Sequence, residues 1–342
     1  MYLILILLWT TISKETRGLG SFLMKNLLEQ LVSQGSKQGV KEYASEVKII
    51  SQLRHKNLVQ LIGWCHRQND LLLIYEFEEN GSLDSYLFNR KGTLTWNVRY
   101  SIARGLASAV LYLHEQWKQC VLHRDIKASN VMLDSNFNAK LGDFGLVRLI
   151  DHEIESKTTA LAGTLGYMPP EAATREKASG ELDIYGFGVV ALEIACGRKA
   201  IGSSLIQEQK YLVEWILELY GKGDIFKAAY PSLCRDFDEN EMKRIMIVGL
   251  WCTQKDYLLR PTMRQVFQVL NFEIPLPILP SQMAVPNYNT SLNLMPSMTH
   301  AFENNQTMPS TSSNSSFTAS SQSSTTFDVI FPSAALLHGH TC

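Results

Sequence analysis

Three stretches in the first part of the chain have hydrophobic patterns that predict regular structure. From Val40 to Leu53, apolar residues recur at helical spacing with charged residues between them, which predicts an amphipathic helix. Leu71 to Phe77 (LLLIYEF) is an apolar run of strand length, and the turn signal Asn80-Gly81 follows it, so we expect a buried strand that leads into a linker. A second helical pattern, with one apolar face, runs from Val98 to Trp117.

The second part of the folded chain is mostly helical in its pattern. The segments with helical periodicity are Asp183–Cys196, Leu212–Leu219, Glu241–Cys252 and Met263–Leu270. Little strand is followed by mostly helix, and the sequence has no internal repeat. This order predicts an α+β protein whose later part is mainly helical.

The two ends of the chain differ from its middle. Met1 to Ile12 is apolar but shorter than the roughly 20 residues that a membrane-spanning helix needs, and it lacks the basic start of a signal peptide. From Pro275 onward Asn, Ser, Thr and Pro dominate and charge is sparse. Such a segment cannot bury enough apolar surface to offset the entropy of ordering it, so we expect residues 275–342 to form a disordered tail.

Composition narrows the classes of partner. The 342 residues include 32 Lys and Arg against 33 Asp and Glu, a formal net charge of -1, so no global field attracts nucleic acid or an anionic membrane. The 6 cysteines are scattered and include no C-x-x-C pair, which argues against a disulfide framework and a zinc site. A reducing cytosol is the compartment that this pattern favours.

One loop between apolar segments concentrates polar chemistry. His123 to Asn130 (HRDIKASN) holds an acid, two bases and an amide. Phosphoryl transfer needs a carboxylate at the attacking hydroxyl and oxygen ligands for magnesium. We expect Asp125 to supply the carboxylate and Asn130 part of the metal site, while Lys127 places a positive charge beside the transferring phosphate.

A second motif, Leu141 to Gly145 (LGDFG), follows closely. Asp143 has glycines nearby that let the backbone bend toward a ligand, and it is the expected second magnesium ligand. Either motif alone is a weak signal, since H-R-D can be a surface charge cluster and D-F-G an ordinary turn. In chain order, H-R-D-x-x-x-x-N, D-F-G and then Pro170-Glu171 form the protein-kinase signature set.

With these motifs in place, the chain from Gly35 to about Leu270 resembles a plant receptor-like serine/threonine protein kinase. The stretches SEVKIISQLRHKNLVQLIGWC, LLLIYEF, HRDIKASNVMLD, LGDFGLVR and GFGVVALEIACGRK are most similar to the kinase domains of legume-lectin (L-type lectin-domain) receptor kinases. The resemblance implies a bilobed protein kinase fold, ATP and Mg²⁺ as cofactors, and protein substrates with Ser or Thr hydroxyls. It also implies a parent family at the plasma membrane, with the kinase facing the cytosol.

The resemblance assigns roles beside the nucleotide. Glu46 matches the helix glutamate that pairs with the lysine holding ATP. Tyr75, Glu76 and Phe77 match the gatekeeper and the hinge beside adenine.

Three further residues match structural positions of the family. Asp183 matches the acid that props the catalytic loop, His123 to Asn130. Glu171 and Arg260 match a buried pair that ties the activation segment to the C-terminal helices. Removing one partner of such a pair leaves the other charge buried, at a cost of roughly 3 to 5 kcal/mol.

The segment from Asp143 to Glu171 contains candidate regulatory threonines. A phosphate on Thr158 or Thr159 would add nearly two negative charges and would pair with Arg124, as in kinases that have Arg before the catalytic Asp. An unmodified surface threonine at 158 is the open alternative. Thr164 is expected to hydrogen-bond to the acid and the lysine of the catalytic loop and so to shape the substrate groove.

The N-terminal part departs from the family pattern. A kinase begins with a glycine-rich hairpin and a V-A-x-K strand, and neither is present here. Leu27 to Val32 takes the place of that strand, which puts the uncharged Gln30 where the lysine belongs. In the catalytic part, Pro169 replaces a usual alanine and Gly186 a usual serine, and both changes look tolerable because the charged groups are intact.

These observations predict an α+β, bilobed protein kinase fold with an incomplete N-terminal β-lobe and an intact, mainly helical C-terminal lobe. The expected divisions are an aberrant apolar N-terminus (1–31), a partial N-lobe (32–79), the C-lobe (80–274) and the tail (275–342). We expect a serine/threonine kinase whose activity is impaired, cytoplasmic as this chain and tied to a membrane only through a missing receptor portion. The alternatives are a pseudokinase that serves as a binding scaffold and a non-functional truncated product.

Overall fold

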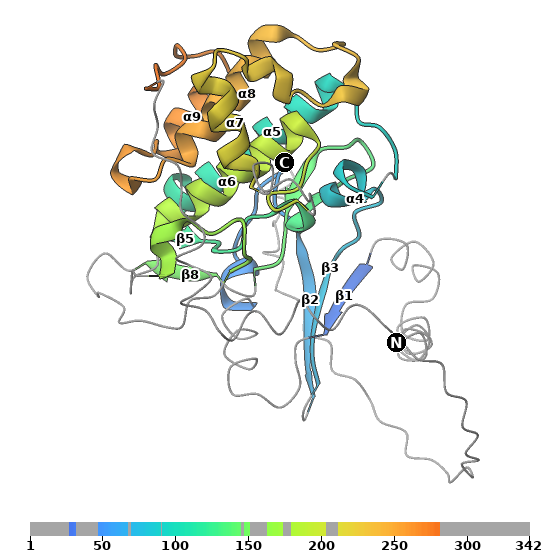
Figure 1. The fold of residues 1–342 in the computed structure, drawn as a ribbon. Helices are drawn as coiled ribbons and strands as arrows, with labels where there is room; N and C mark the ends of the chain where they lie inside the picture. The colour runs from blue at the N-terminus through green and yellow to red at the C-terminus, as the bar shows by residue number, and fades with distance from the viewer. Residues whose placement is uncertain are drawn as a thin grey trace, which may run out of the picture.

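A computed structural model of the chain describes residues 27–31, 47–67, 70–89, 91–144, 147–150, 163–173, 179–202 and 211–280. Within these ranges a three-stranded sheet projects from a larger, mainly helical part (Figure 1). The expected α+β composition with a helical later part is therefore confirmed.

The sheet contains the strand that its apolar run predicted. That strand is β3 (Asp70–Glu76), which lies between β1 (Leu27–Leu31) and β2 (Leu61–Arg67) and pairs antiparallel with both. Residues 47–50 are helical and belong to the amphipathic stretch expected from 40 to 53, whose first part lies outside the described residues.

The long helices α5 to α9 match their predicted positions closely, whereas the short helix α4 was not predicted. Their bounds are α4 (Leu83–Leu87), α5 (Trp96–Leu111), α6 (Gly180–Cys196), α7 (Leu212–Gly221), α8 (Glu239–Cys252) and α9 (Met263–Leu270). A π-helical turn, η1 (Tyr112–Gln116), prolongs α5, so the helical pattern expected up to Trp117 is present but changes its hydrogen bonding. Helix α9 spans the predicted residues, since a capping box at Thr262 and Gln265 fixes its start.

Short strands frame the loop from His123 to Asn130, and 3-10 turns lie both there and among the later helices. One small sheet has the order β4-β6-β7 and another pairs β5 with β8. The strands are β4 (Gly81–Ser82), β5 (Cys120–Leu122), β6 (Val131–Leu133), β7 (Ala139–Leu141) and β8 (Arg148–Ile150). The 3-10 turns are η2 (Ala128–Asn130), η3 (Pro170–Ala173), η5 (Ile225–Ala228), η6 (Pro231–Leu233) and η7 (Tyr257–Leu259).

Helix α6 is the centre of the helical part. It is buried from Asp183 to Cys196, and it packs against α8. Two glycines allow the close approach, because a Cβ at Gly188 would lie 2.6 Å from the Cβ of Cys252 and one at Gly249 would lie 2.6 Å from the Leu192 side chain. The two helices therefore touch along their backbones.

The packed chain continues past the expected start of the tail at residue 275. Leu279 is buried, and its carbonyl accepts a hydrogen bond from the Tyr220 hydroxyl at 2.8 Å. The folded part thus extends to Leu279, because this leucine covers α7, and the residues after 280 lie outside the described ranges. In the ranges that the structure describes, no helix has the length and apolar character needed to cross a membrane.

We predict that Gly188→Ala lowers the free energy of unfolding by about 2 kcal/mol, because the new methyl group overpacks the contact between α6 and α8. Urea unfolding followed by circular dichroism measures the loss. The matched control is Gly180→Ala in the first turn of the same helix, where the nearest atom to the added Cβ, in the ring of His114, is 3.5 Å away. Equal stability of the two variants would contradict the backbone contact as the reason for Gly188.

Candidate active site

The loop from His123 to Asn130 joins β5 to β6 and is held from below by one carboxylate. The backbone N–H groups of His123 and Arg124 donate to the two oxygens of Asp183 in α6, at 2.8 and 2.7 Å. Arg124 has a φ of 72°, a left-handed conformation that costs energy for a residue with a side chain. The two hydrogen bonds to Asp183 stabilise that bend and thereby fix the backbone that leads into Asp125.

Asp183 itself is enclosed and charged. Its side chain is 1% exposed, and His114 lies 2.9 Å from it through Nε2. Burial alone would raise the pKa of Asp183, but the hydrogen bond and charge of His114, the charge of His123 and the Arg124 N–H together hold it below its ordinary value. The carboxylate therefore stays ionised beneath the loop at neutral pH.

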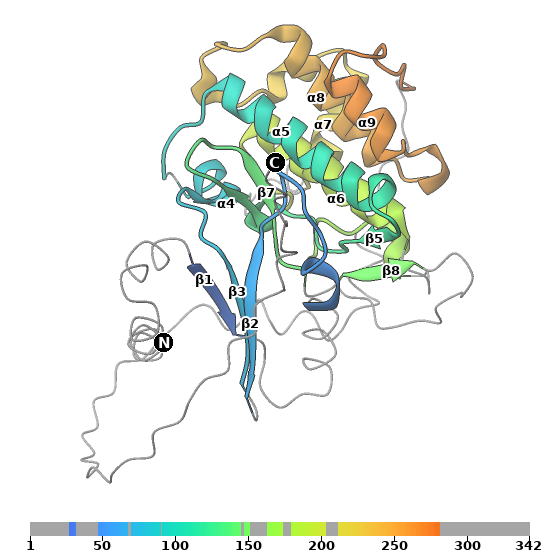
Figure 2. The same cartoon turned by 180° about the vertical axis from the view of Figure 1, so that it is seen from behind.

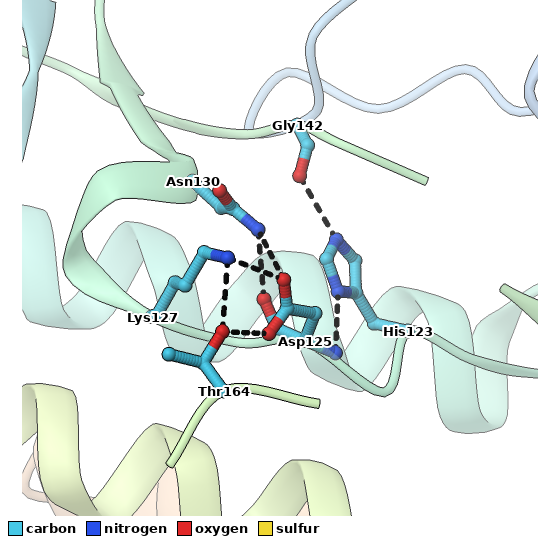
Figure 3. A network of polar contacts seen from close by, with 6 residues as sticks. All are labelled: His123, Asp125, Lys127, Asn130, Gly142 and Thr164. Carbon is cyan, nitrogen blue, oxygen red and sulfur yellow. Dashed lines mark hydrogen bonds and ion pairs between the residues drawn. The ribbon is translucent and has the colours of Figure 1, made fainter. Parts of the chain in front are cut away.

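Above this support, Asp125 lies at the centre of a polar network (Figure 3). Lys127 Nζ donates to Asp125 Oδ2 at 2.6 Å and to the Thr164 hydroxyl at 3.0 Å. Thr164 in turn donates its hydroxyl hydrogen to Asp125 Oδ1 at 2.7 Å. The structure thus brings together the expected acid, the expected lysine and the threonine predicted to shape the substrate groove.

Asn130 turns its amide nitrogen toward the same acid. Its Nδ2 donates to the backbone oxygen of Asp125 at 3.0 Å and to Asp125 Oδ2 at 3.2 Å, which leaves the side-chain oxygen on the other side (Figure 3). The Gly142 N–H donates to the Asn130 carbonyl at 2.9 Å, so the segment that ends in Asp143 runs beside Asn130. Mg²⁺ prefers oxygen ligands, and the side-chain oxygens of Asn130 and Asp143 are of the amide and carboxylate types that suit this ion.

The D-F-G segment is fixed from the loop as well. His123 Nε2 lies 3.0 Å from the Gly142 carbonyl, and its ring lies 5.0 Å from that of Phe144. Phe144 is fully buried, and the half-buried Asp143 has a φ of 63°. A buried ring on one side and a bent backbone on the other position the Asp143 carboxylate.

The expected adenine-side residues lie at the end of β3. Tyr75 is buried, whereas Glu76 is exposed and Phe77 is 37% exposed. The Glu76 N–H donates to the Gln60 carbonyl at 2.9 Å. These residues therefore form the border between the three-stranded sheet and the helical part.

The segment expected to replace the lysine-bearing strand forms strand β1 beside β3. In the antiparallel register Gln30 faces Leu73 and Leu28 faces Tyr75. Glu46, the expected partner of the missing lysine, lies outside the described residues, as do Thr158 and Thr159.

Glu171 and Arg260 meet as an ion pair, with Oε1 and Nη1 2.6 Å apart. The Arg260 side chain is fully buried, and it also donates to the carbonyl oxygens of Gln254 and Glu181. Its guanidinium lies over the ring of Tyr185. The pair joins η3 to the start of α6 and to the loop before α9.

Gly186, a departure from the family pattern, lies directly under the catalytic loop. A Cβ at this position would come within 2.9 Å of the carbonyl oxygen of Ile126. The glycine therefore lets α6 approach the backbone between the catalytic acid and lysine.

Sequence reasoning missed the fully buried carboxylate of Glu193. It accepts hydrogen bonds from the Tyr167 hydroxyl at 2.9 and 3.0 Å and from the Ala200 N–H at 2.8 Å. Burial raises the pKa of Glu193 to about 8, although both hydrogen bonds act to lower it. Its signal was a single acid within the apolar run VVALEIAC, where a charge needs partners.

Comparison of this chain with known proteins identifies its family and its relatives. Residues 15–271 match the family described as protein kinase domain. The chain is 57% identical over 260 residues to L-type lectin-domain containing receptor kinase IX.1 of Arabidopsis thaliana, covering 75% of this chain and 40% of the relative. It is 53% identical over 269 residues to receptor kinase IX.2 of the same plant, covering 76% and 40%.

A rice relative gives the same picture. The L-type lectin-domain containing receptor kinase SIT2 of Oryza sativa subsp. japonica is 47% identical over 249 residues, covering 72% of this chain and 37% of the relative. The chain thus spans about two fifths of the length of the curated relatives that it matches.

We predict that Asp183→Asn lowers the free energy of unfolding by about 3 kcal/mol, because an amide can accept only one of the two backbone N–H bonds and turns a donor toward the other. Urea unfolding measures the change. The control is Asp238→Asn, at the exposed N-cap of α8, where asparagine is as good a cap as aspartate. If both variants lose the same small amount, Asp183 does not hold the loop.

A second prediction concerns the pH dependence of stability. Because the native state raises the pKa of Glu193 from 4.5 to about 8, its contribution is complete below about pH 4.5 and is lost as the pH rises toward about 8. Glu193→Gln keeps an acceptor for Tyr167 without the titration. Relative to this variant, the wild-type chain should lose about 2 to 4 kcal/mol between pH 5 and 8 in urea unfolding. Parallel curves for the two proteins would contradict the pKa assignment.

Proposed function

Because the chain belongs to the protein kinase family, as a relative of the serine/threonine receptor kinases, we propose that it carries the ATP-dependent phosphoryl-transfer site of a receptor-like serine/threonine kinase. The observation that carries this proposal is a network in which Asp125 and Lys127, on the loop fixed by Asp183, both bind Thr164 of a separate segment. It joins a carboxylate base to a fixed cation within hydrogen-bond distance, as phosphoryl transfer to a hydroxyl needs.

Each member of the network then has a role. Asp125 accepts the proton of the substrate serine or threonine hydroxyl, and Lys127 stabilises the negative charge of the transferring phosphate. Thr164 holds both side chains in the observed arrangement. Asn130, through its side-chain oxygen, and Asp143 would hold Mg²⁺, which when bound neutralises charge on the ATP phosphates.

We further propose the bilobed arrangement, with the division between the lobes at 79. The expected divisions at 31 and 274 move outward, because β1 pairs with β3 and Leu279 is buried. The sheet of β1, β2 and β3 would form the smaller lobe, and Tyr75, Glu76 and Phe77 would lie against adenine. Phosphate on Thr158 or Thr159, paired with Arg124, stays a prediction for regulation. Attachment to a membrane and any ligand-binding portion would belong to the rest of a longer receptor, as in the relatives' names.

Impaired activity in this chain is the second part of the proposal. The register of β1 with β3 supports the placement of Gln30 at the position of the ATP-holding lysine. An amide cannot replace the charge of an ammonium group at the phosphates. Losing such a contact costs several kcal/mol of transition-state stabilisation and thus several orders of magnitude in rate.

The same observation favours a second candidate, a pseudokinase. In that case the folded surface binds partner proteins and no phosphate is transferred. The two candidates differ in whether restoring the cation restores the reaction.

We predict that the unmodified chain binds Mg-ATP weakly and that Gln30→Lys raises its phosphoryl transfer to a generic serine/threonine substrate by at least about tenfold. A thermal-shift titration with Mg-ATP and a radiolabelled phosphate-transfer assay make the measurements. The matched control is Glu29→Lys, at the neighbouring position, which belongs to the opposite face of the strand. Only the lysine at position 30 should increase activity.

Restored transfer should disappear in Gln30→Lys combined with Asp125→Asn or Asp143→Asn, which keep the shape and delete the charge. If Gln30→Lys gains nothing, residues 1–32 are replaced by a glycine-rich hairpin and a V-A-V-K strand. A repaired chain that binds Mg-ATP and still transfers no phosphate would favour the pseudokinase. Ordinary kinase turnover by the unmodified chain, roughly 1 to 100 s⁻¹, would contradict impairment.

A further inference from the structure

A polar cavity of about 450 Å³ lies apart from the active site. Its walls come from α5, α9, the turn between β6 and β7, and the loop before β2, and α5 and α9 lie on the face seen in Figure 2. None of its lining residues belongs to the network around Asp125. The proposed kinase reaction therefore gives this cavity no role.

Three cationic side chains line the cavity from three different elements. Lys56 comes from the loop before β2, Arg104 from α5 and Lys140 from β7. Arg104 is oriented by α9, since its Nε donates to Asn271 Oδ1 at 2.7 Å. Within the described ranges, no carboxylate lies at ion-pair distance from any of the three. Their positive charges thus face one polar space.

The acidic groups nearby leave much of this charge uncompensated. Asp134 is the one acid among the lining residues, and its oxygens accept hydrogen bonds from the N–H groups of Asn136 and Asn138 and from the Asn138 side chain. Asp134 is therefore held by its own turn, and its charge also offsets part of the charge of Lys140. Lys140 also faces Glu78, but burial raises the pKa of Glu78 to about 7, so near neutral pH a large fraction of this group is uncharged.

The wall also contains a buried acceptor. Asn57 is 6% exposed, its Nδ2 donates to the Ala139 carbonyl at 2.8 Å, and its Oδ1 has no hydrogen-bond partner among the described residues. Gly105 backs this side chain, because a Cβ there would lie 2.8 Å from Asn57 Nδ2. A buried acceptor without a donor is costly, and this oxygen has no exposed surface, so a ligand would reach it only after the Asn57 side chain rotates.

We propose that this cavity binds a phosphorylated serine or threonine side chain of a peptide segment. A phosphate monoester carries close to two negative charges and three acceptor oxygens, which matches cations that converge from three directions. Ser101 and Ser108 in the same lining offer further hydroxyl donors. A phosphorylated side chain with its peptide backbone fills more of the cavity of about 450 Å³ than inorganic phosphate does. The cavity thus recognises phosphorylated protein independently of catalysis.

The test is fluorescence anisotropy with the full chain, in the absence of ATP and at low salt. The probe is a fluorescein-labelled seven-residue peptide of glycine and serine with one phosphoserine at its centre. Peptides with serine or aspartate at that position should bind at least about tenfold more weakly. Each of Lys56→Ala, Arg104→Ala and Lys140→Ala should weaken phosphopeptide binding several-fold, and the triple variant about a hundredfold or more.

The matched control removes three exposed lysines elsewhere, Lys227, Lys243 and Lys255, and should change the affinity by less than about twofold. Urea unfolding checks that each variant is folded. If the triple variant is unfolded, the exposed Lys56→Ala and Arg104→Ala decide the question, because neither side chain is part of the core.

Three results would overturn the proposal. Equal binding of the aspartate peptide would show that the cavity binds acidic peptides without selecting phosphate. Equally good competition by free phosphoserine or inorganic phosphate would show that no peptide is recognised. Unchanged binding by the folded triple variant would place the phosphopeptide at another site. Because no ATP is present, none of these outcomes depends on whether the chain transfers phosphate.

Discussion

The geometry of the active site depends on one carboxylate that accepts two backbone hydrogen bonds. Asp183 extends from α6 and receives the N–H groups of His123 and Arg124, which makes the left-handed bend at Arg124 affordable. A neutral side chain could not satisfy both donors, and an unsupported buried charge would be expelled or protonated. The pair with His114 and the packing of α6 at the centre of the helical part together keep the charge in place.

This constraint propagates to the reacting groups through short contacts. Once the bend is fixed, Asp125 is within reach of Lys127, Asn130 and Thr164, and the His123 ring holds the Gly142 carbonyl. Glycines at 186 and 188 let α6 lie close enough to the loop and to α8 to make this possible. The helix that supports the chemistry is thus also the helix on which the core is built.

The sequence predicted the long elements well and the short ones poorly, for physical reasons. Met263–Leu270 was found in full because amphipathic periodicity and a capping box act locally. Strands of three residues, such as β6 and β7, carry no periodicity, and they pair because the turn closed by Asp134 and Asn138 brings them together. The π-helical turn after α5 had no local signal either.

Sequence analysis could propose Asp125, Asn130 and Asp143 as site residues because each lies at a fixed spacing within a short motif. His114 and Glu193 were not proposed, since each depends on a partner that is distant in sequence, namely Asp183 and Tyr167. Leu279 was assigned to the tail because composition cannot show that one leucine covers α7. Long-range contacts of single residues are therefore what pattern analysis leaves out.

The catalytic network is structurally independent of the segment in which the chain departs from its family. Within the described residues, the side-chain hydrogen bonds of His123, Asp125, Lys127 and Thr164 all join residues between 123 and 183. No hydrogen bond from β1 is needed to build it. The presence of glutamine in place of lysine at position 30 should then leave the loop geometry unchanged and act on the grip of the phosphates alone. A slow kinase and a pseudokinase therefore share the arrangement of the loop, and phosphate transfer after the cation at position 30 is restored separates them.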